Sequence, residues 1–83
     1  MPLYLDVHNK IEGLTKEGVE HAHQRDLEVQ EKYGVKYLRY WYDTESGRVY
    51  CLVEAPSAEA ADAVHREAHG LLADEINPVA EGA

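Results

Sequence analysis

The stretch VKYLRYWYDTESGRVYCLVE, residues 35–54, decides the fold because it has the pattern of two strands joined by a tight turn. Residues 35–43 and 48–54 are rich in β-branched and aromatic side chains, which favour strands. The turn TESG between them ends in Gly47, and glycine adopts a positive φ at no steric cost. The stretch therefore predicts a β-hairpin in the middle of the chain.

Helical patterns flank this hairpin on both sides. The first begins after Thr15, whose side chain suits an N-cap, runs to about Tyr33 and ends at Gly34. The second covers roughly residues 58–72, with Ser57 as its N-cap and a break near Gly70. We therefore expect a helix before the hairpin and another after it.

Two further strands complete the pattern. LYLDVH, residues 3–8, alternates apolar and polar side chains, and the tail INPVAEGA, residues 76–83, can form an edge strand because Pro78 is tolerated at an edge. The order β-α-β-β-α-β is the ferredoxin-like motif, in which two helices cover one face of an antiparallel sheet. We expect one α+β domain over residues 1–83, with a dimer formed through the uncovered sheet face, which would carry Tyr and Trp side chains.

Alternation in the first strand divides its side chains between the two sheet faces. Leu3, Leu5 and Val7 share one face, while Asp6 and His8 share the other. If the leucines face the helices, Asp6 and His8 lie on the open face. Asp6 then belongs to a different site from His23, whereas His8, at the end of the strand, can serve either site.

The composition limits the classes of partner. The chain has 16 acidic and 8 basic residues, a net charge of −8, and no cluster of Lys and Arg for phosphate contacts. No stretch approaches the ~20 apolar residues of a membrane span. A single cysteine, Cys51, fits a reducing compartment. We expect a cytoplasmic protein that binds neither nucleic acid nor membrane.

The first helix has polar side chains on its apolar face. His23, Asp26 and Gln30 lie at spacing i, i+3, i+7, which places them on one stripe. The apolar members of that face are Val19, Ala22, Val29 and Tyr33. Buried polar groups need partners, so the stripe indicates either a hydrogen-bonded network that fixes helix packing or a binding site.

The second helix repeats the pattern. His65 falls inside its apolar arc and His69 at the edge of that arc, and residues four apart on a helix can bind one ion. Arg66 stands where a zincin metalloprotease has glutamate, and no CxxC pair suggests structural zinc. Cys51 suits a small core residue as well as a ligand.

Histidine together with carboxylate favours a divalent transition metal, because imidazole suits nickel, zinc and copper. We predict metal ligands among His8, His23, Asp26, His65 and His69, with Asp6, Gln30 and Cys51 as further residues of the pocket.

The segments AHQRDLEVQEKYGVKYLRYWYD, RVYCLVEAP and AVHREAHGLLADEI together resemble a family of small bacterial nickel-binding proteins with a ferredoxin-like fold. The resemblance spans most of the chain and implies a homodimer that binds nickel, with no established enzymatic reaction. Carried over by position, it points to His8, His23, His65 and His69.

Two hypotheses follow. The first is a nickel-binding cytoplasmic homodimer that sequesters or senses the metal, with zinc or copper as other candidate ions. The second is a small enzyme or organic-ligand-binding domain of the dimeric α+β barrel type. An enclosed cavity with His23, Asp26 and Cys51 in its wall would favour the second hypothesis, and imidazoles that converge on one point would favour the first.

Overall fold

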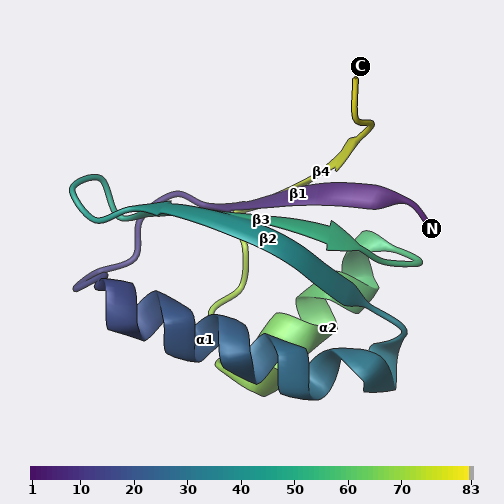
Figure 1. Ribbon diagram of the computed structural model, residues 1–83, viewed down its shortest axis with the longest axis horizontal. Coiled ribbons are helices and arrows are strands. Elements are labelled where there is room, and N and C mark those ends of the chain that lie inside the picture. The colour runs from purple at the N-terminus through teal and green to yellow at the C-terminus, as the bar shows by residue number, and fades with distance from the viewer. Residues whose placement is uncertain (83) are drawn as a thin grey trace.

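The computed structural model describes residues 1–82, which form a four-stranded sheet and two α-helices (Figure 1). In chain order the elements are β1 (Leu3–His8), α1 (Lys16–Val29), the short 3-10 helix η1 (Gln30–Tyr33), β2 (Lys36–Asp43), β3 (Arg48–Glu54), α2 (Ala58–Ala68) and β4 (Glu75–Val79). Among these residues no helix is both long and apolar enough to cross a bilayer.

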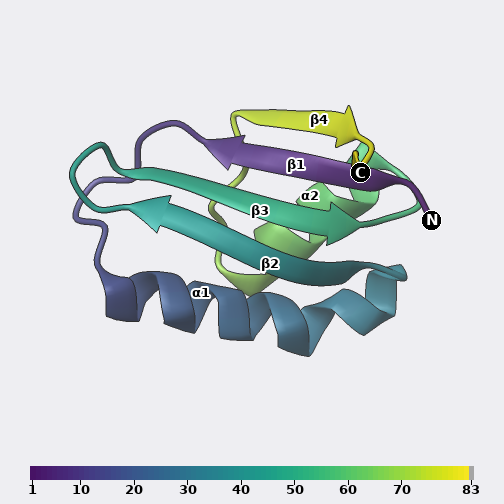
Figure 2. The ribbon, with the colours of Figure 1, turned by 45° about the horizontal axis from the view of Figure 1, so that its top comes forward.

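The sheet has the strand order β2-β3-β1-β4, and every neighbouring pair is antiparallel (Figure 2). Both helices lie on the same side of the sheet (Figure 1). The strand β4 forms one edge, where Pro78 faces Tyr4 across the β1–β4 pair. This arrangement confirms the predicted α+β, ferredoxin-like architecture.

The predicted caps and turns determine where the elements begin and end. The Thr15 side chain accepts a hydrogen bond from the Gly18 N–H, and Ser57 accepts one from the Ala60 N–H, as expected for N-caps. Gly47 has φ +79° in the hairpin turn.

The second helix is shorter than predicted. It ends at Ala68, because His69 leaves the helical conformation and Gly70 adopts φ +79°. The N–H groups of His69 and Gly70 both donate to the carbonyl of His65, which closes the helix end. His69 therefore lies just beyond the helix, and its ring is close to His65.

The face of β1 that packs against the helices is the one with Asp6 and His8. Asp6 is fully buried and His8 is 4% exposed. The expectation that these two residues lie on the open face is therefore wrong. Leu3 and Leu5 instead line the open face, and the buried core between sheet and helices is mostly valine and alanine.

The uncovered face of the sheet is apolar. Leu38 and Trp41 of β2 are 37% and 49% exposed there, beside Leu52 of β3. Two tyrosines of β2 lie on the covered face instead: Tyr37 is buried under the helices, and Tyr40 lies against His23 of α1. The open face thus carries the tryptophan but not most of the tyrosines near it in sequence.

Candidate metal centre

His65 is the centre of a buried polar cluster between α2 and the sheet. Its Nε2 lies 2.9 Å from Asp6 Oδ2, and its Nδ1 lies 2.9 Å from Asp26 Oδ1. All three residues are at most 2% exposed. Two carboxylates, one from β1 and one from α1, therefore contact opposite edges of one imidazole ring.

This arrangement determines the charge of His65. Burial by itself lowers the pKa of His65, but the hydrogen bonds to Asp26 and Asp6 outweigh burial and raise that pKa to about 12. Burial raises the pKa of Asp26, yet hydrogen bonds from His65 and His69 outweigh it and leave that pKa below its usual range. The metal-free cluster thus contains an imidazolium between two carboxylate groups.

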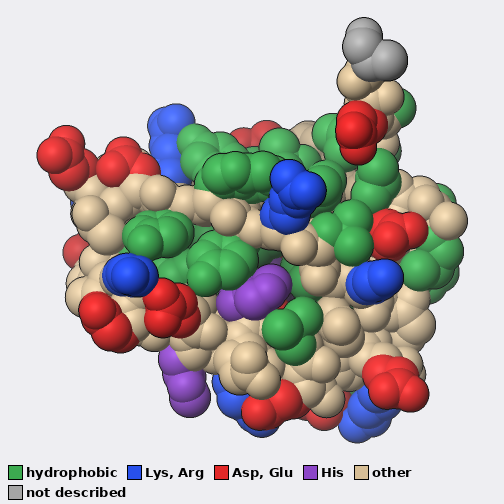
Figure 3. Space-filling view, viewed as in Figure 1, with side chains coloured by type: hydrophobic (Ala, Val, Ile, Leu, Met, Phe, Trp, Pro, Cys, Tyr) green, Lys and Arg blue, Asp and Glu red, His purple; other side chains and the backbone are tan. Residues whose placement is uncertain are grey.

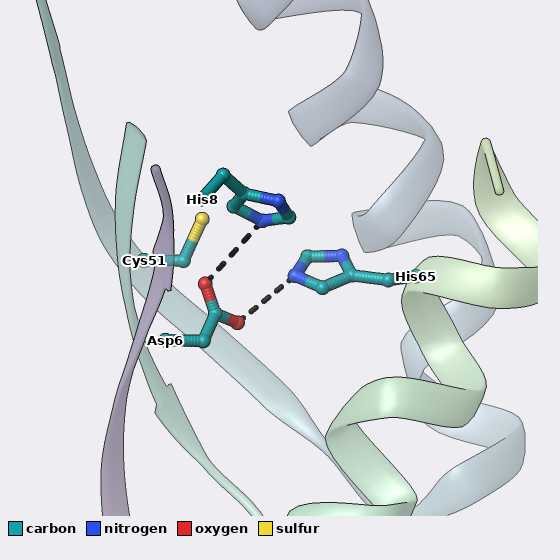
Figure 4. A group of neighbouring side chains, drawn as sticks. All are labelled: Asp6, His8, Cys51 and His65. Atoms are coloured by element: carbon teal, nitrogen blue, oxygen red, sulfur yellow. Dashed lines mark hydrogen bonds and ion pairs between the residues drawn. The ribbon is translucent and has the colours of Figure 1, made fainter. Parts of the chain in front are cut away.

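A first group of possible ligands consists of Asp6, His8, Cys51 and His65 (Figure 4). One donor atom from each lies within 4.8 Å of the others, and all four residues are buried. Asp6 Oδ1 has no hydrogen-bond partner and lies 3.6 Å from His8 Nε2. A buried carboxylate oxygen without a partner is costly, and a cation is one of the groups that can satisfy it.

Unlike His65, the other two neighbours of Asp6 in this group, His8 and Cys51, are uncharged at neutral pH. Burial lowers the pKa of His8, which leaves its imidazole neutral and able to coordinate a metal. Burial raises the pKa of the Cys51 thiol to about 12, so the sulfur keeps its proton until a metal displaces it.

A second group consists of Asp26, His65 and His69. His69 Nδ1 accepts a hydrogen bond from the Leu71 N–H, so its other nitrogen, Nε2, carries the proton of the neutral ring. That Nε2 lies 3.2 Å from Asp26 Oδ1. The ring nitrogens of His65 and His69 that face Asp26 therefore donate hydrogen bonds to it. Because these nitrogens carry protons, the second group has fewer free lone pairs for a metal than the first.

Tyr37 belongs to the cluster, although the sequence analysis treated its segment only as strand. Its hydroxyl lies 3.1 Å from His65 Nε2, 3.1 Å from the Ala61 carbonyl and 3.4 Å from Asp6 Oδ2. Burial and the nearby carboxylates raise its pKa, so it stays protonated. The β2–β3 pairing is irregular between Tyr37 and Arg39. This irregularity interrupts the alternation of side chains along β2, so the sequence pattern does not predict which face of the sheet Tyr37 occupies.

Two residues predicted near the site lie outside both groups. Gln30 accepts a hydrogen bond from the Tyr37 N–H and so connects η1 to β2. His23 packs its ring 4.5 Å from that of Tyr40, and burial lowers its pKa. His21, on the opposite side of α1, is exposed. Gln30 therefore has a structural partner, whereas His23 Nδ1 is buried without one.

The chemistry of the first group suits a divalent transition metal. It combines imidazole nitrogen, carboxylate oxygen and sulfur, and mixed N, O and S donors favour nickel, zinc or copper over calcium or magnesium. The orphaned Asp6 oxygen shows that these residues fit a cation.

The comparisons with known proteins agree with this chemistry. Residues 4–79 match the family described as "Nickel responsive protein SCO4226-like". The chain is also similar to the crystal structure of SCO4226 from Streptomyces coelicolor A3(2), with 43% sequence identity and a TM-score of 0.90. That similarity covers 98% of this chain and 99% of the other. No curated protein matches the chain. The chain belongs to the SCO4226-like family of nickel responsive proteins.

Proposed function

We propose that this protein binds nickel(II) through Asp6, His8, Cys51 and His65. The observation that carries the proposal is the buried Asp6 Oδ1, which has no hydrogen-bond partner although an imidazole and a thiol lie beside it. A metal ion there would supply the positive charge that this oxygen lacks. The family's description as nickel responsive supports nickel over zinc or copper, which would suit the same ligands.

Asp26 has a different role in this proposal. It accepts the hydrogen bond from His65 Nδ1, while His65 Nε2 faces Asp6. Metal-binding histidines commonly donate their second N–H to a carboxylate, which fixes the ring and makes it a stronger ligand. Asp26, with His69 beside it, would therefore orient His65, and His23 would not be needed for the metal.

The test is a calorimetric titration of Ni²⁺ into metal-free protein that carries no histidine tag. We expect a dissociation constant well below millimolar for the wild type and loss of binding in His8→Ala. Asp26→Asn, which keeps the side-chain shape, should weaken binding roughly 10- to 100-fold. His21→Ala and His23→Ala are the matched controls and should bind like the wild type. Wild-type binding no tighter than millimolar, or unchanged binding in His8→Ala, contradicts the proposal.

We further propose that two copies pair through their open sheet faces. Leu3, Leu5, Leu38, Trp41 and Leu52 form an apolar surface there, and a chain of 83 residues buries little surface on its own. Light scattering after size exclusion should give twice the protomer mass. Leu38→Glu, at an exposed position, should give a monomer, while His21→Glu on α1 should stay dimeric. A monomeric wild type contradicts the dimer.

The biological role that we propose is sequestration or sensing of nickel in the cytoplasm. The family description supports a link to nickel. The single cysteine, retained as a thiol beside the cluster, is compatible with a reducing compartment. Comparison of nickel tolerance in cells with and without the protein tests this role, and unchanged growth and unchanged metal content would contradict it.

A further inference from the structure

A cavity of about 150 Å³ lies between α1 and the inner face of the sheet, and three of the proposed metal ligands, His8, Cys51 and His65, form one part of its wall. Its walls are mostly aliphatic, and include Ile11, Leu14, Val19, Ala22, Val49 and Leu71. Figure 3 shows a histidine side chain among hydrophobic ones in the seam between the helix and the sheet. A metal ion with protein ligands does not require an apolar space of this size, so the cavity needs a separate explanation.

One polar atom in this wall has no protein partner. His23 Nδ1 is buried and makes no hydrogen bond, although its ring is held against Tyr40 at 4.5 Å between centroids. Ligand pockets typically combine apolar walls with a few polar groups that fix the orientation of the ligand. Away from the metal-centre residues, the cavity therefore has mostly apolar walls for the body of a ligand and the unpartnered ring nitrogen of His23 for its polar group.

We propose that the cavity binds a small, neutral aromatic molecule with a single hydrogen-bonding group, of the phenol class. The size fits, because an engineered apolar cavity of about 150 Å³ is known to take benzene. The aromatic pair of His23 and Tyr40 offers ring edges and faces for stacking. The mostly apolar wall favours a neutral ligand over an ion. This inference goes beyond nickel binding and does not depend on it.

Phenol and benzene are the probes, titrated into metal-free protein and followed by ¹H–¹⁵N correlation spectra. We expect saturable shifts at the amides of Val19, Ala22 and Val49, with phenol bound at about millimolar concentration. Because phenol alone can bond to His23, it should bind roughly 2- to 10-fold more tightly than benzene. His23→Ala should remove that preference, and His21→Ala, on the exposed side of α1, should keep it.

A substitution that fills the cavity tests its location. Ala22→Leu adds volume inside the cavity without changing any proposed metal ligand, and should weaken phenol binding roughly tenfold or more. Val49→Ile is the second variant if Ala22→Leu does not fold. Absence of saturable shifts, shifts confined to the open sheet face, or full binding in a folded Ala22→Leu protein would overturn the inference. Nickel binding by Ala22→Leu should be unchanged, which separates this result from failure of the proposed metal site.

Discussion

Raising the pH should destabilise the metal-free protein through His65 alone over a defined range. Its folded pKa of about 12 lies far above the value near 6.5 of an unfolded histidine. The stabilisation is fully present below about pH 6.5 and is lost as the pH rises toward the folded pKa, because the folded state then retains a proton that the unfolded state releases. His8 and His23 have lowered pKa values and are neutral in both states above that pH.

The size of this loss of stability follows from the single proton that His65 retains in the folded state. The free energy of unfolding changes by about 1.4 kcal/mol per pH unit for each proton, so between about pH 7.0 and 8.5 the protein should lose about 2 kcal/mol. Cys51 adds a second proton only above roughly pH 8.5, where an unfolded thiol ionises. With a urea slope of about 1 kcal/mol per molar, the unfolding midpoint should fall by roughly 2 M.

Urea unfolding of metal-free protein at several pH values measures this loss, and His21→Ala should show the same slope. Nitrogen-15 spectra of the histidine rings give a direct measurement in the wild type, because the two nitrogens of His65 should keep the shifts of a doubly protonated ring at about pH 8.5. A His65 ring that titrates near pH 6.5, or a midpoint that does not change with pH, would refute the reasoning.

Three further substitutions or measurements test other parts of the structure. Nickel binding at about pH 8 should release close to two protons, one from His65 and one from Cys51. The variant Cys51→Ala should release only one. Calorimetry in buffers of different ionisation enthalpy measures the number of protons released. Tyr37→Phe should cost about 1–3 kcal/mol of stability in urea unfolding, because the buried partners of its hydroxyl lose a hydrogen bond. Gly47→Ala should cost about 1–3 kcal/mol by thermal unfolding, since φ is +79° and the new Cβ would approach the Ile11 carbonyl oxygen to 3.0 Å.

Local sequence signals were sufficient to predict the fold. Hydrophobic period, capping side chains and turn glycines each depend on near neighbours in the chain, and Thr15, Ser57 and Gly47 behave as those rules require. The end of α2 differs from its predicted bound because Leu71 and Leu72 extend the apolar pattern beyond Gly70, whereas the break expected near Gly70 is where the backbone turns.

The assignment of faces in β1 failed for a physical reason. The rule that apolar side chains face the core assumes one apolar and one wet face, whereas in this sheet the outer face is apolar and the inner face holds Asp6 and His8. The His65 ring, which comes from another element, hydrogen-bonds to both buried carboxylates and offsets one of their two negative charges. His65 and Asp6 are in contact although they are 59 positions apart in the chain. Local sequence patterns do not predict such a contact, so the residues of the cluster could be predicted on each element but not brought together.

The proton on His65 has a consequence for how the protein would cycle between loaded and empty forms. Many small metal-binding domains unfold when the metal leaves, because nothing else neutralises their ligands. Here the imidazolium already provides a positive charge between Asp6 and Asp26, so we expect the metal-free protein to stay folded. Under the proposed function, uptake would exchange protons for nickel within an unchanged framework, and acidification would favour release. Because one Ni²⁺ would replace about two protons, the two forms would have nearly the same net charge as well as nearly the same shape. A partner that distinguishes them would then have to detect where the charge lies in the cluster.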